Sequence, residues 1–159
     1  AIILRPSIIF GNNDNFFGQF AKISNFSPIL PLIGSNTKFQ PIYIEDISES
    51  VINLLKGDKN FHKIYEMGGP KIYTFEQLLL LMLKTLKKRR FLLKLNPKLM
   101  MIPGYFFNFL PKPPFTDDQM KLLLTDNTVN SEMPGLKELN IKPTSLEEVI
   151  PKILKFYKS

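Results

Sequence analysis

The sequence predicts an α/β protein in which short buried strands lead into loops and helices. Residues 1–4 form an apolar run without alternation, as expected for a parallel strand buried on both faces. Pro6 should end that strand, because proline has no N–H for the ladder. Residues 62–67 are predicted to form another buried strand, and Thr74 with Gln77 has the spacing of a capping box that opens a helix. In open α/β sheets, ligands bind at the carboxyl ends of such strands.

Between these strands the pattern predicts an excursion over about residues 12–44. Asp14 or Asn15 can cap a helix whose aromatic and apolar residues recur at helical spacing, which favours a core position for Phe16, Phe17, Phe20, Ile23 and Phe26. Residues 27–35 contain two prolines and are expected to form an extended connector that ends in a turn at Gly34. Residues 38–44 follow as a short strand, interrupted at Pro41.

Two further helices are predicted from their termini. Glu45 and Asp46 precede an amphipathic segment that stops at Gly57, so Asp46 is most simply a negative charge in the first turn. Thr144 with Glu147 has the spacing of another capping box at the start of the last helix, as have Thr116 and Gln119 further upstream.

Composition excludes several classes of site. The 159 residues contain no Cys and a single His, His62, so a zinc or other transition-metal site is not expected. Most of the net charge of +7 comes from one cluster, formed by Lys84, Lys87, Lys88, Arg89, Arg90 and Lys94. These basic residues are not interleaved with stacking aromatics on a recognisable platform, so no nucleic-acid partner is predicted.

Three stretches in this order resemble the extended short-chain dehydrogenase/reductases. Leu4-Arg5-Pro6 followed by Ile8-Ile9-Phe10-Gly11 is similar to their segment after the catalytic helix. Residues 39–47 resemble their strand that leads into an aspartate-headed helix. Residues 64–69 with Thr74 resemble their last sheet strand and the helix after it.

The C-terminal part narrows this resemblance. Residues 115–123 with Asp126-Asn127, then residues 136–143 and 144–150, are similar to the carboxyl-terminal part of the nucleotide-binding accessory subunit of respiratory complex I and its bacterial relatives. These are atypical members of the extended dehydrogenase/reductase family. The resemblance covers essentially the whole chain.

The resemblance implies the C-terminal portion of an extended Rossmann-type fold with a small, mainly helical lid or substrate domain. Residues 1–70 would hold the last strands and helices of the Rossmann-type domain and residues 71–159 the lid, with the nucleotide-binding half upstream. Pro6, Ser7, Ile8 and Ile9 would line the nicotinamide side of NADP(H) or NAD(H), and Phe39 and Gln40 the substrate side.

The implied function is that of a structural accessory subunit, peripheral on the inner or cytoplasmic membrane and on its matrix or cytoplasmic side. The residues between Lys84 and Leu110, basic and then apolar, suggest contact with complex I subunits and the membrane surface. An alternative is an active reductase or epimerase that acts on a nucleotide sugar or a lipid-like carbonyl. That chemistry needs a tyrosine followed four residues later by a lysine. No tyrosine of this sequence has one, and the pair is expected upstream of residue 1, so its absence here does not decide between the two functions.

Overall fold

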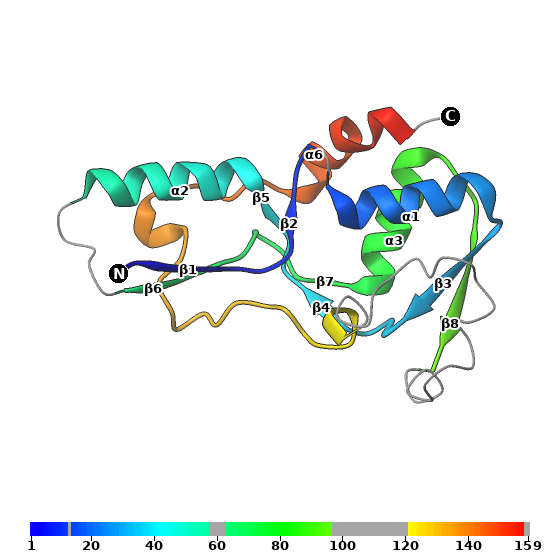
Figure 1. The fold of residues 1–159 in the computed structure, drawn as a ribbon, viewed down its shortest axis with the longest axis horizontal. Coiled ribbons are helices and arrows are strands. Elements are labelled where there is room, and N and C mark those ends of the chain that lie inside the picture. The colour runs from blue at the N-terminus through cyan, green and yellow to red at the C-terminus, as the bar shows by residue number, and fades with distance from the viewer. Residues whose placement is uncertain (13, 58–62, 97–120, 158–159) are drawn as a thin grey trace.

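The computed structural model describes residues 1–12, 14–57, 63–96 and 121–157, and it confirms an α/β fold with parallel strand pairs (Figure 1). The described helices are α1 Asn15–Phe26, α2 Ile44–Lys56, α3 Phe75–Leu86 and α6 Leu146–Ile153, with short 3-10 helices η1 Lys137–Leu139 and η2 Leu154–Tyr157.

The strands form four two-stranded pairs. Three pairs are parallel: β1 Ile3–Pro6 with β6 Ile64–Met67, β2 Ile9–Phe10 with β5 Ile42–Tyr43, and β3 Ile29–Ile33 with β8 Phe91–Leu95. The fourth, β4 Lys38–Phe39 with β7 Tyr73–Thr74, is antiparallel. Since parallel partners need a crossover, each pair joins segments that are distant in the sequence.

The molecule is elongated, with a different core toward each end (Figure 1). Near the N-terminus, α2 and η1 lie beside β1 and β6, and the core residues there are Ile42, Leu54, Tyr65, Met67, Leu136, Leu139 and Ile141. Toward the other end, α1, α3, α6 and the β3–β8 pair enclose the larger core. Segments from before and after residue 70 contribute to both cores, and a domain boundary at that residue stays a prediction.

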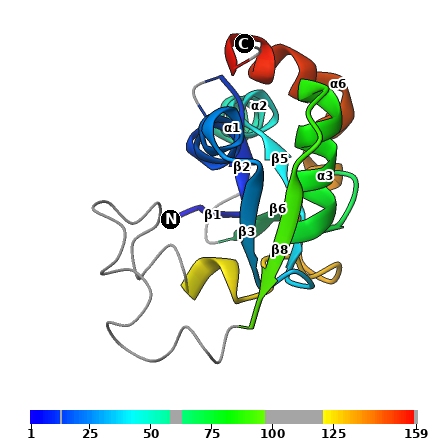
Figure 2. The same cartoon turned by 90° about the vertical axis from the view of Figure 1, so that its right-hand side faces the viewer.

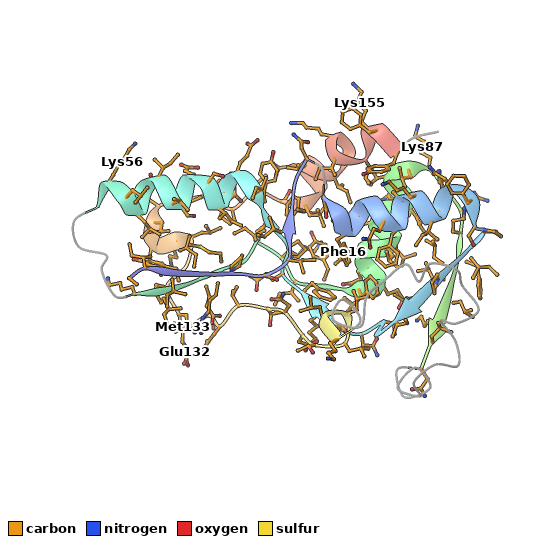
Figure 3. The ribbon with its side chains drawn as sticks, viewed as in Figure 1. Phe16, Lys56, Lys87, Glu132, Met133 and Lys155 are labelled. Atoms are coloured by element: carbon orange, nitrogen blue, oxygen red, sulfur yellow. The ribbon has the colours of Figure 1, made fainter. Side chains whose placement is uncertain are left out.

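Aromatic rings dominate the larger core. Phe16, which points inward from α1 in Figure 3, has its ring centroid 5.7 Å from that of Phe75 on α3 and 6.3 Å from that of Phe39 on β4. Phe20 lies 5.4 Å from Phe75. The predicted aromatic face of α1 is thus confirmed, except that Phe26 at the end of the helix is 90% exposed.

The helix termini confirm two of the expected caps. Asp14 accepts hydrogen bonds from the backbone N–H groups of Phe16 and Phe17 at the start of α1. Thr74 and Gln77 form the reciprocal capping box of α3. These caps are visible in the sequence because both partners lie within one helical turn.

The predicted capping box formed by Thr144 and Glu147 is wrong. The N-cap of α6 is Ser145, whereas Thr144 donates from its backbone N–H and its hydroxyl to the carboxylate of Asp46, at 2.8 and 2.7 Å. Asp46 is buried, so it is a link between α2 and the start of α6 as well as a charge in the first turn of α2. Sequence spacing could not show a partner 98 residues away.

Two strand predictions also need correction. Residues 27–35 were expected to be a connector, but they contain β3, which pairs with β8 along its whole length. β1 does end at Pro6 as predicted, yet it is not buried on both faces: Ile3 is 46% exposed, since β6 is its only strand partner among the described residues. His62, the Thr116–Gln119 pair and the apolar residues 97–110 lie outside the described residues.

Candidate functional site

The predicted cofactor residues lie where the chain leaves the carboxyl end of β1 and turns into β2. Pro6 is exposed and Ile9 is 41% exposed, so together they offer apolar surface at this edge. Ile8 packs against the larger core, and Ser7 is buried. The exposed Pro6 and Ile9 thus flank the buried Ser7 and the partly buried Ile8.

Ser7 is held by three segments that meet here. Its backbone N–H donates to the carbonyl of Met67 at the end of β6, at 2.9 Å. Its hydroxyl donates to the carbonyl of Asn127 at 2.5 Å and accepts from the N–H of Gln40 at 3.2 Å. The Ser7 side chain thus fixes the site's backbone, and its hydroxyl is already committed within the protein.

The side chain of Gln40 continues this network. Its amide nitrogen donates to the carbonyl of Gly69 at 2.8 Å, and its amide oxygen accepts from the N–H of Val129 at 3.2 Å. A Cβ atom built on Gly68 would lie 2.7 Å from the Gln40 side chain, and one built on Gly69 only 1.9 Å from the carbonyl oxygen of Pro41. The glycine pair after β6 thus allows this close approach.

Sequence reasoning brought Ser7 and Gln40 into one site but missed the segment that joins them. Asp126 accepts from the N–H of Lys38 at 2.8 Å, and the N–H of Asn127 donates to the carbonyl of Lys38 at the same distance. The segment at Asp126-Asn127 therefore lies beside β4, and Asn127 forms an isolated parallel bridge with Phe39. The Asp126-Asn127 dipeptide was the available signal, although it was used only for the resemblance.

Phe39 has a different position from the other predicted site residues. Its side chain is buried, with its ring 6.2 Å from that of Phe75, and belongs to the larger core. A place for Phe39 on the substrate side of the site stays a prediction.

Acidic and phenolic groups elsewhere have shifted pKa values with structural causes. Burial raises the pKa of Asp14 to about 6, against the opposing effect of its two backbone hydrogen bonds. Burial, and then the hydrogen bond to Glu147 at 2.6 Å, raises the pKa of Tyr73. Lys71 pairs with the other oxygen of Glu147 at 3.2 Å. The phenol of Tyr73 is thus stabilised in its protonated form, which opposes a role as a ready proton donor.

The exposed residues could contact one side of a dinucleotide. A nicotinamide ring is flat, and exposed apolar surface at the carboxyl end of a parallel strand could pack against its face. Pro6 and Ile9 would supply that contact, while Ser7 and Gln40 would keep the backbone rigid behind them. When bound, the cofactor would supply hydride-transfer capacity. No group of His, Asp and Glu residues suited to a metal ion occurs within the described ranges.

Helices α1, α2, α3 and α6 are too short to cross a bilayer, and no other helix in the described part of the chain is long and apolar enough to do so.

Comparison with known proteins gives a consistent set of relatives, although no family model matches the sequence. The chain is 31% identical to subunit 9 of the NADH dehydrogenase [ubiquinone] 1 alpha subcomplex, mitochondrial, from Arabidopsis thaliana, over 92% of this chain and 39% of the relative. It is 30% identical to the same subunit from Mus musculus, over 92% and 40%, and 26% identical to that from Dictyostelium discoideum, over 98% and 45%.

Solved structures share the fold at low sequence identity. A UDP-glucose 4-epimerase with UDP-glucose from Thermotoga maritima has a TM-score of 0.65 at 17% identity, covering 99% of this chain and 45% of the other. A dTDP-glucose 4,6-dehydratase in complex with NAD from Bacillus anthracis has a TM-score of 0.66 at 14% identity, covering 99% and 44%.

The chain spans less than half the length of the curated relatives and of the solved structures that it matches. Both comparisons nevertheless cover nearly all of this chain, 98% for the Dictyostelium discoideum relative and 99% for the Thermotoga maritima structure. The chain is therefore a homologue of the alpha subcomplex subunit 9 proteins of mitochondrial NADH dehydrogenase, with the fold of the C-terminal portion of an extended short-chain dehydrogenase/reductase.

Proposed function

We propose that this chain is the C-terminal part of an accessory subunit of respiratory complex I that binds a nicotinamide dinucleotide as part of its structure. The observation that carries the proposal is the similarity to subunit 9 proteins from a plant, a mammal and an amoeba over at least 92% of the chain. The hydrogen bonds of Ser7 and Gln40 support a structural role, because both side chains bond to backbone atoms of the protein itself.

The bound cofactor in this proposal is NAD(H) or NADP(H). Solved structures with this fold include one with NAD, from Bacillus anthracis, and one with NADPH, the RMD protein from Pseudomonas aeruginosa, at a TM-score of 0.65 and 10% identity over 99% of this chain and 48% of the other. Pro6, Ser7, Ile8 and Ile9 would form the nicotinamide side of the site, with Gln40 behind them and Phe39 toward the substrate end.

The proposed location is peripheral, on the matrix side of the mitochondrial inner membrane or on the cytoplasmic side of a bacterial one. The relatives from Dictyostelium discoideum and Mus musculus are named as mitochondrial subunits. Residues between Lys84 and Leu110 would contribute to contact with the other subunits and the membrane.

Affinity capture of the full-length protein from its source membranes tests the assembly part. A tagged copy should migrate with the complex on a native gel and bring down the other subunits of complex I. Recovery of the tagged protein alone and in soluble form, with turnover of a carbonyl substrate, would instead favour the reductase or epimerase alternative.

A pair of substitutions tests the cofactor part. Ile9→Asp should lower the nucleotide content of the purified protein at least about tenfold, because a carboxylate at the apolar surface is left without a partner when the ring binds. Ile52→Asp on α2 is the matched control, since Ile52 is similarly exposed but lies outside the site. Equal nucleotide content in both variants would show that Ile9 does not border the cofactor.

A further inference from the structure

An open cavity of about 530 Å³ lies beside the junction of α3 and β8. Three of its lining residues are apolar, namely Leu80, Leu83 and Phe91. The other four are cationic: Lys84, Lys88, Arg89 and Arg90. No carboxylate lines it, so the cavity combines an apolar wall with an uncompensated positive rim.

Two of the four cations hold the cavity in shape. The Nε of Arg90 donates to the carbonyl of Ser24 at 2.8 Å, and the ammonium of Lys88 donates to the side chain of Asn25. Both partners lie in the last turn of α1, where the carbonyl groups carry partial negative charge. These contacts tie the loop before β8 to α1.

The other two cations remain available for a ligand. Lys84 and Arg89 are exposed, and neither makes an ion pair within the part of the chain that the structure describes. Glu76, an acid on the same helix, is paired with Lys94 at 2.8 Å. Lys87, which points outward at the end of α3 in Figure 3, adds further positive charge to this end of the molecule.

Exposed apolar side chains adjoin this rim. Phe91 is 66% exposed and Leu80 is half exposed. Ile29 on β3 is the register partner of Phe91 on β8, and it is also exposed, so the two side chains lie on the same face of the ribbon. Figure 2 shows β3 and β8 side by side at this end. Parallel strands are normally covered on both faces, whereas this face is exposed at Ile29 and Phe91 within the described part of the chain.

We propose that the surface formed by Leu80, Lys84, Arg89 and Phe91 binds a membrane that contains anionic phospholipids. Lys84 and Arg89 would contact lipid phosphates, while Phe91 and Leu80 would insert among the upper acyl carbons. Charge complementarity favours an anionic membrane, since the rim is cationic and the exposed side chains of Phe91 and Leu80 adjoin it. This inference names the surface through which the protein would contact the membrane, and it rests on the proposed function as a peripheral subunit.

Vesicle sedimentation with the full-length protein tests the site. The protein should bind weakly to vesicles of phosphatidylcholine alone. It should bind at least about tenfold more strongly to vesicles with about one phosphatidylglycerol per two phosphatidylcholines. The variant Lys84→Glu with Arg89→Glu should lose that gain, and Phe91→Ser should weaken binding to both kinds of vesicle. A milder variant, Lys84→Gln with Arg89→Gln, keeps the test valid if charge reversal prevents folding.

The matched control is Lys137→Glu with Lys142→Glu, which makes the same change in net charge at exposed lysines near the other end of the molecule. Loss of vesicle binding in the site variants but not in this control supports the inference. Equal loss in both pairs would show a general charge effect and overturn it, as would absence of binding to anionic vesicles.

Capture of complex I subunits by the same variants separates this inference from the proposed function. Vesicle binding through Lys84 and Arg89 without capture of complex I would support the membrane site and refute the accessory role. If the Lys84 and Arg89 variants bind vesicles normally but fail to capture complex I, the surface binds protein and the membrane inference is wrong.

Discussion

At the scale of single residues, Asp14 shows how one position can serve as a cap and still oppose stability at neutral pH. Its carboxylate caps α1, but burial raises its pKa from 3.8 to about 6. The folded state therefore binds a proton more tightly than the unfolded state does.

The resulting prediction concerns the pH dependence of stability. The contribution of Asp14 to the free energy of unfolding is complete below about pH 4 and is lost as the pH rises to about 6, by roughly 1–2 kcal/mol after allowance for partial exposure. Asp14→Asn should keep the cap and remove this slope. Urea unfolding of the two proteins across this range is the measurement, and an unchanged slope in the variant would contradict the assignment.

Asp46 gives a second prediction at this scale. Its buried carboxylate accepts both hydrogen bonds from Thr144, so Asp46→Ala should lower the free energy of unfolding by about 2–3 kcal/mol. Thr144→Val should cost about 1 kcal/mol, because it removes only the hydroxyl bond. A double-mutant cycle by denaturant unfolding measures the coupling through the Thr144 hydroxyl, and additive effects would show that this hydroxyl bond does not contribute to stability.

At the scale of elements, the turn after β6 depends on close backbone contact. Gly69→Ala places a Cβ atom 1.9 Å from the carbonyl oxygen of Pro41, and backbone cannot move aside as a flexible side chain can. We expect a loss of about 2 kcal/mol or more in thermal or urea unfolding. Ser131→Ala, at an exposed position of the neighbouring loop, should change stability by less than about 0.5 kcal/mol. Similar losses in both variants would contradict the steric argument.

The same scale explains which elements the sequence could predict. The aromatic face of α1 and the Thr74–Gln77 box depend on partners within a few residues, so their spacing is sufficient. The pairing of β3 with β8 depends on strands that are far apart in the chain. The prolines in residues 27–35 favoured a connector over a strand, so β3 was not predicted. Pro31 is compatible with a two-stranded ribbon because one side of an edge strand needs no N–H donor.

In the candidate site, too, the sequence could predict some contributions and not others. Ser7 and Gln40 were identified from the resemblance, because their side chains occupy motif positions. The carbonyl of Asn127 and the N–H of Val129 complete the network through backbone atoms. Backbone contacts of this kind place little constraint on residue type, so no pattern in the sequence could reveal them.

At the scale of the whole molecule, one edge of β1 determines how the isolated chain should behave. Within the described residues β1 pairs with β6 alone, and Ile3 on β1 is 46% exposed. An uncovered apolar strand edge promotes association between chains.

We expect residues 1–159 alone to self-associate at micromolar concentration, as measured by light scattering, and Ile3→Lys to reduce that association. Leu55→Lys is a suitable control, since Leu55 is also exposed but lies on α2. A monomeric wild-type chain, or an equal effect of both substitutions, would show that the β1 edge is not responsible.

The account as a whole predicts a dinucleotide that stays with the protein inside complex I. The most direct measurement is the nucleotide released by denaturation of the native complex, purified through a tag on the full-length protein and compared with the amount of that protein. We predict about one NAD(H) or NADP(H) per copy, together with the other complex I subunits. A purified protein that contains neither bound nucleotide nor other subunits of the complex would contradict the account.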